Sequence, residues 1–245
     1  LNPKLDLNGY DALAKIRILS SLAFNTILSK NKILTEGIQG INLIDILSAK
    51  KFGYKIKLLA ISKLRGDSLE VRVHPAMIPF KNPLGAVDGV LNAIKISDEI
   101  MGESILIGHG AGALPTASAV LGDVVEIGRN IVAHASSCRV PVQSYPKSGQ
   151  NKISIKCINE IESEYFLRFN VQDRPSVLSI ISGILGEHSI SIKSVIQRRR
   201  DLDGKGVPLV LMTHLANEKD IQDALQKIDQ QEVVYEKSIL IRCED

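Results

Sequence analysis

Residues 164–171 read EYFLRFNV, an aromatic and β-branched run that predicts a buried strand. Asp173-Arg174-Pro175 follows this run, and the pattern from there to about residue 187 predicts a helix. The remaining residues predict two strands at 190–199 and 208–215, a helix at 217–229 and a last strand at 232–242. These six elements follow one another in the order βαββαβ within a short, compact stretch.

This order is that of a ferredoxin-like domain, and its details resemble an ACT domain, a small amino-acid-sensing module. The resemblance rests on Asp173-Arg174-Pro175, on Leu178 and Ile181, and on the run SISIKSVIQ at 189–197. It implies an ACT regulatory domain over residues 158–245, with threonine as a possible effector. Ser176 replaces the Gly that is common after the Asp-Arg-Pro tripeptide, so weak or absent effector binding is also an expected outcome.

The N-terminal part, residues 1–145, mixes helices and strands without regular alternation. Its predicted helices are 10–29, 41–51 and 114–130, and its predicted strands are 54–64, 68–74, 87–96 and 103–108. Since strands and helices do not alternate, we expect an α+β fold with a mixed, mostly antiparallel sheet and helices on one face. Pro, Ser, Gly and Asn interrupt the pattern over 141–155, which predicts a linker between two domains.

The N-terminus carries polar residues at fixed offsets, Asn2-Pro3-x-x-Asp6-Leu7-x-Gly9-x-Asp11-x-x-x-Lys15. Asp11 and Lys15 stand four residues apart on the first predicted helix and therefore share one helix face. Such a pair is common on protein surfaces and contributes only about 0.2–0.5 kcal/mol. On spacing alone, a surface ion pair is favoured over a functional one, and the constrained residues around Asp6 and Gly9 shift the balance towards function.

The segment Gly108-His109-Gly110-Ala111-Gly112-Ala113 fits the pattern G-x-G-x-x-A between a strand and a helix. No second parallel strand and no acidic residue at its end follow, so we reject a dinucleotide-binding fold for this segment. Two alternatives remain open. A ligand could approach the glycine backbone and the free N–H groups of the next helix, or the glycines could only make a tight connection.

Together, these motifs resemble the homoserine dehydrogenase family. The N-terminal motif is similar to the C-terminal half of the family signature, and the glycine segment is similar to its cofactor loop, although His109 stands where Arg is frequent. The resemblance implies NAD(P)-dependent interconversion of aspartate 4-semialdehyde and homoserine, in threonine, methionine and isoleucine biosynthesis. It implies the following site: Lys15 as proton donor and acceptor, Asp11 and Asp6 as substrate-binding residues, and Gly112 and Gly110 as cofactor contacts.

The family carries an N-terminal Rossmann domain that binds most of the NADP or NAD, and these 245 residues contain none of it. A substrate-binding Glu expected just before Leu1 is also missing. We therefore expect the chain alone to be inactive. The alternative is a non-catalytic module for amino-acid sensing and oligomerisation, and the codons upstream of Leu1 would distinguish the two.

The amino-acid composition argues against nucleic acids and membranes as binding partners. Lys+Arg 30 against Asp+Glu 27 gives a net charge of +3, and the chain has no Trp, so a nucleic-acid surface is not expected. No apolar run reaches the roughly 20 residues that span a bilayer. The three widely spaced cysteines fit neither a disulfide framework nor a metal site and favour the cytoplasm. The isolated histidines are expected to be structural, and the family resemblance implies a homodimer or homotetramer.

Overall fold

The computed structural model describes residues 4–134, the N-terminal half, and residues 153–197 and 206–245, the C-terminal half. The elements of the N-terminal half are α1 (Lys4–Leu7), α2 (Tyr10–Phe24), β1 (Leu34–Thr35), α3 (Leu43–Lys51), β2 (Tyr54–Arg65), β3 (Ser68–Pro79), β4 (Leu91–Asp98), β5 (Gly102–His109) and α4 (Ala113–Val132). Those of the C-terminal half are β6 (Ser154–Ile155), β7 (Glu162–Ser163), β8 (Tyr165–Val171), α5 (Val177–Glu187), β9 (Ile192–Gln197), β10 (Val207–Thr213), β11 (Ala216–Asn217), α6 (Glu218–Asp229) and β12 (Val234–Cys243). Short 3₁₀ turns within the described residues lie at Lys30–Lys32, Pro83–Ala86 and Ile158–Glu160.

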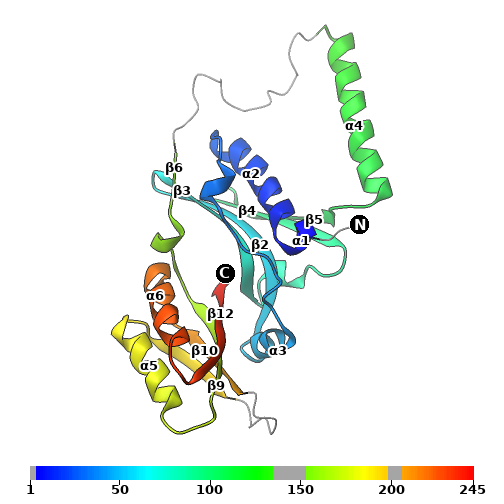
Figure 1. The fold of residues 1–245 in the computed structure, drawn as a ribbon. Coiled ribbons are helices and arrows are strands. Elements are labelled where there is room, and N and C mark those ends of the chain that lie inside the picture. Colours follow the sequence, from blue (N-terminus) through cyan, green and yellow to red (C-terminus); the bar gives the residue numbers. More distant parts are fainter. Residues whose placement is uncertain (1–3, 135–152, 198–205) are drawn as a thin grey trace.

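One mixed sheet of eight strands runs through both halves, in the order β1-β3-β12-β8-β10-β9, with β2 and β6 also paired to β3. β2 pairs antiparallel with β3 along its whole length. The other edge of β3 is shared by three short parallel pairings: β6 at Ser68, β1 at Arg72 and β12 at Ala76. Because β12 pairs with both β8 and β3, it joins the two halves (Figure 1).

In the N-terminal half, α2 and α3 cover one face of β2 and β3, as predicted for the helices of this part, whereas α4 does not pack on the sheet. α2 packs on Leu69, Val71 and Val73, and α3 packs in the same cluster as Met77. Since these β3 residues are all odd-numbered, they point to the same face of the strand.

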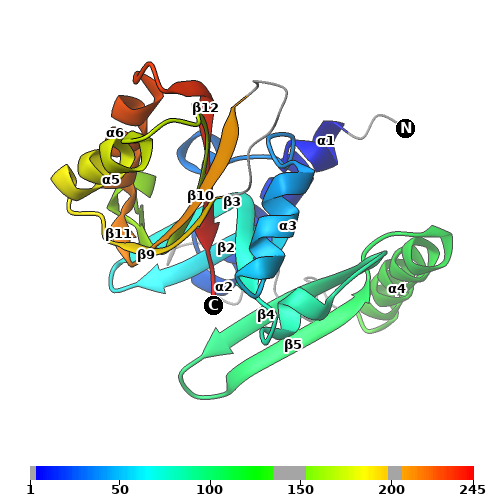
Figure 2. The ribbon, with the colours of Figure 1, turned by 90° about the horizontal axis from the view of Figure 1, so that it is seen from below.

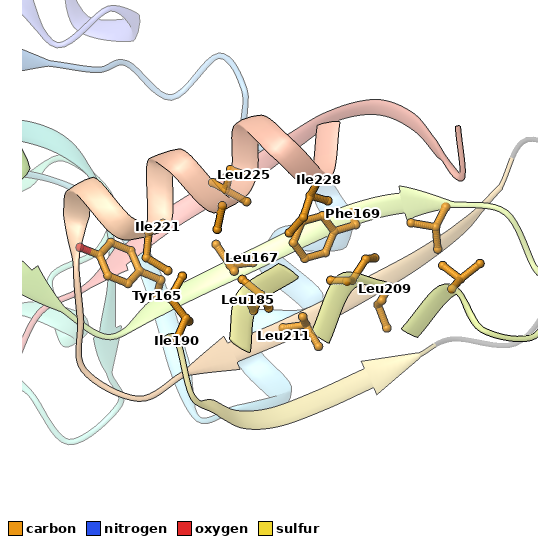
Figure 3. Packing of buried hydrophobic residues seen from close by; sticks show 14 of the residues in the cluster. Tyr165, Leu167, Phe169, Leu185, Ile190, Leu209, Leu211, Ile221, Leu225 and Ile228 are labelled. Carbon is orange, nitrogen blue, oxygen red and sulfur yellow. The ribbon is translucent and has the colours of Figure 1, made fainter. Parts of the chain in front are cut away.

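The C-terminal half uses the opposite face of the continuous sheet. Tyr165, Leu167 and Phe169 of β8 pack beneath α5 and α6 (Figure 3), whereas the alternate residue Phe166 packs in the cluster of α3 and Met77. The βαββαβ order and the antiparallel pairing of β8, β9, β10 and β12 confirm the ferredoxin-like arrangement.

β4 and β5 form a separate antiparallel hairpin, and α4 projects from its end away from the main sheet (Figures 1 and 2). α4 buries none of its residues. Hairpin and helix together expose many large apolar side chains, among them Ile94, Leu106, Leu121, Val124 and Ile131. In the described ranges, no helix combines the length and the apolar content needed to cross a bilayer.

Three predicted boundaries are wrong. The helix predicted over 10–29 ends at Phe24, because Asn25 adopts a left-handed conformation with φ of 49° that stops it. The strand predicted over 68–74 continues through Pro75, which lies between the short pairings of β1 and β12 where the edge has no continuous partner. The strand predicted over 87–96 begins only at Leu91, and most of the predicted linker lies outside the described residues.

Candidate functional site

The N-terminal motif lies on α1 and α2. Asp6 is exposed on α1, and Gly9 connects the two helices with φ of 77°, a left-handed conformation that favours glycine. On α2, Lys15 Nζ lies 2.6 Å from Asp11 Oδ2. The two side chains that were expected on one face therefore form an ion pair one helical turn apart.

This pair lies on an open surface. The side chains of Lys15 and Asp11 are 57% and 44% exposed. Two clefts of about 690 and 750 Å³ lie elsewhere, one between residues 36–41 and α6, the other beside Arg72. The partial burial that a catalytic lysine needs is not provided by the described residues. Acid–base chemistry at Lys15 therefore requires a further surface that closes over α2.

The backbone of residues 7–9 rests on residues 35–38. Ile38 N donates a 2.9 Å hydrogen bond to Leu7 O. A Cβ on Gly37 would overlap this same carbonyl oxygen, and a Cβ on Gly9 would lie 3.2 Å from Glu36 O. Both glycines are thus required by close backbone packing. The sequence pattern signalled the constraint at Gly9 but gave no reason to single out Gly37.

The two glycines predicted to touch a cofactor lie elsewhere, in the loop between β5 and α4. A Cβ on Gly110 would overlap the side-chain amide of Asn92, and Gly112 has φ of 135°. Pro115, the third residue of α4, has no N–H to offer a ligand. Local packing against Asn92 and Pro115 and the positive φ of Gly112 account for both glycines.

Sequence reasoning missed a layer of buried charged side chains on β3, on the face opposite to α2. Arg72 Nε donates to His74 Nε2 at 2.9 Å, and His74 Nδ1 donates to Pro75 O at 2.9 Å. Arg72 also pairs with Glu70 and Glu244. Burial, together with the nearby charge of Arg242, lowers the pKa of His74 to about 3. His74 is therefore a neutral residue inside a strand and not, as predicted, a residue at a strand end.

Arg242 on β12 continues this layer at the joint between the halves. Its Nε and Nη2 donate to the two carboxylate oxygens of Glu218 at 2.9 and 2.6 Å. Its Nη1 donates to Glu36 at 2.8 Å. Burial alone would raise the pKa of Glu218, but the hydrogen bonds and charge of Arg242 outweigh burial and lower this pKa. Tyr165 Oη and Gln222 also donate to Glu218, at 3.0 and 2.9 Å.

A second ion pair crosses between the halves. Arg168 Nε on β8 donates to Asp45 Oδ1 on α3 at 2.6 Å, and both side chains are buried. Among the described residues, no group of three or more His, Cys, Asp or Glu could hold a metal ion. The buried charges at the joint are therefore paired with one another across the two halves.

Two different family models match the N-terminal and the C-terminal half of the chain. A family model for homoserine dehydrogenase matches residues 1–125, and a model for the ACT domain matches residues 165–233. The chain is 38% identical over 245 residues to the homoserine dehydrogenase of Helicobacter pylori and 37% identical over 243 residues to that of Neisseria gonorrhoeae. These matches cover 100% and 99% of this chain, and 56% and 55% of those proteins.

A solved structure agrees as well. The crystal structure of a homoserine dehydrogenase from Thiobacillus denitrificans superposes with a TM-score of 0.89 at 35% identity, over 100% of this chain and 55% of that one. The chain thus spans about 55% of the length of the relatives that it matches. With residues 1–125 of the 245 matched by the first model alone, the chain belongs to the homoserine dehydrogenase family.

Proposed function

We propose that this chain supplies the substrate-side residues of a homoserine dehydrogenase, which interconverts aspartate 4-semialdehyde and homoserine with NAD or NADP. Family membership supports the reaction, and the geometry of α1 and α2 supports the site. The division into a catalytic domain over 1–145 and an ACT regulatory domain over 158–245 is part of the proposal. The biosynthesis of threonine, methionine and isoleucine, in the cytoplasm, is the corresponding pathway.

Lys15 is the proposed proton donor and acceptor. In the oxidation of homoserine, its neutral amine takes the hydroxyl proton, and in the reverse direction its ammonium returns this proton to the developing alkoxide. Asp11, whose carboxylate lies 2.6 Å from Nζ, orients the lysine and accepts a hydrogen bond from the substrate. Asp6, exposed on α1 at the entrance to α2, binds the substrate ammonium.

The nicotinamide cofactor supplies the hydride exchange when it is bound. In this chain, Gly110 and Gly112 would line only the edge of the cofactor site, because Asn92 and Pro115 fill the space beside these two glycines. The groups that bind most of the cofactor are proposed to lie outside residues 1–245. The choice between NAD and NADP would be made by those groups.

The exposed apolar side chains support assembly with further surfaces. A two-stranded hairpin is only marginally stable alone, and contiguous exposed apolar side chains mark interaction sites. We propose that α4 packs against the cofactor-binding part and that the β4–β5 hairpin contributes to a homodimer or homotetramer. Either contact could supply the burial that Lys15 requires. Threonine is the proposed effector of the C-terminal half.

The observation that carries the proposal is the Asp11–Lys15 ion pair within a segment that the family model matches. The test is homoserine-dependent reduction of NAD or NADP by the full-length protein that contains this chain, followed by absorbance. The Asp11→Asn variant should lower kcat/KM for homoserine about ten-fold or more and leave the KM for the cofactor unchanged. Asp67→Asn, an exposed aspartate in the turn between β2 and β3, is the matched control.

Two results would contradict the proposal. The first is the absence of homoserine-dependent reduction with either cofactor. The second is an equal response of the Asp11 and Asp67 variants. Calorimetric titration with threonine distinguishes the enzyme from the non-catalytic sensing module. A protein that binds threonine but does not oxidise homoserine would be a regulatory module only.

A further inference from the structure

We propose that Arg242 of the C-terminal half and Glu36 of the N-terminal half are positioning residues: through their contact they hold in place the substrate-side loop of residues 6–9, which comprises the end of α1 and the turn into α2. The inference rests on the proposed function, since it concerns the same loop. It assigns a role to two residues that lie far apart in the sequence and outside the N-terminal motif. Three observations support it: a rigid anchor, a bridge between the halves and a close-packed seat for the loop.

The anchor is the Arg242–Glu218 pair, in which each side chain is only 1% exposed. The guanidinium makes a two-pronged contact with the carboxylate, and Tyr165 and Gln222 donate to the same carboxylate from β8 and α6. A buried arginine with this many charge-assisted contacts has little freedom to move. The position of Arg242 is therefore set by the fold of the C-terminal half.

The bridge is the remaining side of the same guanidinium. Arg242 Nη1 donates to Glu36 Oε2 at 2.8 Å, and Nη2 lies 3.5 Å from Glu36 Oε1. Glu36 follows β1 in the N-terminal half, and its own N–H donates to Val73 O on β3 at 2.8 Å. Arg242 thus binds one carboxylate from each half, and Glu36 is held by its side chain and by its backbone.

The seat is the segment directly after Glu36. A side chain at Gly37 would overlap the Leu7 carbonyl, whose oxygen accepts the hydrogen bond from Ile38 N. A Cβ on Gly9 would contact the Glu36 carbonyl at 3.2 Å. With so little free space, a shift of residues 36–38 must shift residues 7–9 as well. Gly9 O accepts from Leu13 N in the first turn of α2, so the same shift reaches the turn that carries Asp11.

The Asp45–Arg168 pair offers a matched control. It also joins the two halves, with Arg168 Nε 2.6 Å from Asp45 Oδ1, but it lies on α3 and β8. The hydrogen bonds described for these two side chains go to each other and to Asn42, and not to residues 6–9. Loss of either pair should weaken the joint between the halves. Only loss of the Glu36–Arg242 contact should disturb the loop.

The experiment compares Glu36→Ala with Asp45→Asn in the full-length protein. Glu36 is 41% exposed, so its loss leaves Arg242 paired with Glu218 and the remaining donor accessible to water. We expect Glu36→Ala to raise the KM for homoserine about ten-fold, with the KM for the cofactor unchanged, because misplacement of substrate contacts has large kinetic effects. Asp45→Asn should leave both KM values unchanged. Unchanged homoserine KM in Glu36→Ala, or an equal rise in both variants, would overturn the proposal.

Amide hydrogen exchange decides the inference even if the protein does not oxidise homoserine. In Glu36→Ala, the amides of Ile38 and Leu13 should exchange about ten-fold faster than in the wild type, because the loop and the first turn of α2 open more often. In Asp45→Asn any faster exchange should follow the lower stability of the whole protein and affect the amides of β3 to the same extent, with no selective increase at Ile38 and Leu13. Unchanged exchange at both amides in Glu36→Ala would refute the link, whatever the fate of the proposed activity.

Discussion

The Asp45–Arg168 pair gives the sharpest prediction about stability. Asp45 is 0% exposed, and Arg168 is 8% exposed over its side chain. Breaking a buried ion pair from one side costs about 3–5 kcal/mol, because the remaining charge stays buried without its partner. Asp45 also accepts a hydrogen bond from Asn42 N in a capping box at the start of α3. We therefore expect Asp45→Asn to lower the free energy of unfolding by about 3 kcal/mol or more.

Two further variants divide this loss. Asn42→Ala removes the cap but keeps the ion pair, and should cost about 1 kcal/mol. The double variant Asp45→Asn/Arg168→Met removes both charges and should be more stable than Asp45→Asn alone, since apolar replacement of a buried pair is often neutral. Urea unfolding followed by circular dichroism measures all four proteins. A loss below about 1 kcal/mol in Asp45→Asn, or no recovery in the double variant, would refute the reasoning.

Three further predictions test the fold, at His74, at Gly37 with Gly40 as its control, and at Ser176. The pKa of His74 is lowered to about 3 in the folded state, so the unfolded chain binds a proton at a higher pH than the folded protein does. The free energy of unfolding should therefore fall as the pH drops from about 6.5 towards 3, by at most about 1.4 kcal/mol per pH unit. His74→Gln should flatten this slope between pH values of about 6.5 and 5, as measured by urea unfolding. Gly37→Ala should lower the free energy of unfolding by about 2 kcal/mol or more, because its methyl group would overlap Leu7 O. In the control Gly40→Ala, the new Cβ has its nearest neighbour at 3.9 Å, and the free energy of unfolding should change by less than about 0.5 kcal/mol. Ser176 has φ of 72°, a left-handed conformation that favours glycine, so Ser176→Gly should raise the free energy of unfolding by about 0.5–1 kcal/mol. A melting temperature below that of the wild type would contradict this prediction.

Local patterns were sufficient for the elements of the C-terminal half. The residues of β8, β10 and β12 alternate between two apolar clusters, and the helices carry caps or turns at their ends. For these reasons β8, α5, β10 and α6 are found close to their predicted ranges. The order of the strands followed from the βαββαβ pattern. The parallel pairing of β12 with β3 could not be predicted, because it joins residues more than 160 positions apart through only two registered pairs.

The buried charged layer was missed for a related reason. Arg72 and His74 alternate with Val71 and Val73 in β3, and such alternation ordinarily predicts a solvated polar face. In the structure, this face is covered by the joint with the C-terminal half, where Arg242 and Glu244 arrive from the end of the chain. Burial of these charges depends on pairing partners that no local window contains.

The sequence predicted the local motif of the candidate site but not the burial of its side chains. The four-residue spacing of Asp11 and Lys15 correctly predicted their shared face. Spacing did not predict that Lys15 would be more than half exposed, since burial depends on surfaces outside α2. Gly110 and Gly112 form a tight connection between β5 and α4, one of the two alternatives left open by the sequence. Their contact with a cofactor stays a prediction.

The turnover of a Lys15 variant tests the central claim most directly. Lys15→Ala in the full-length protein should lower kcat for homoserine oxidation by about 10²–10⁴-fold, because a positioned proton acceptor contributes this much, while homoserine binding changes less. Lys50→Ala, an exposed lysine at the end of α3, is the matched control and should keep the wild-type kcat. A Lys15→Ala protein that folds normally and turns over at the rate of the Lys50 variant would contradict the assignment of Lys15 as the acid–base residue.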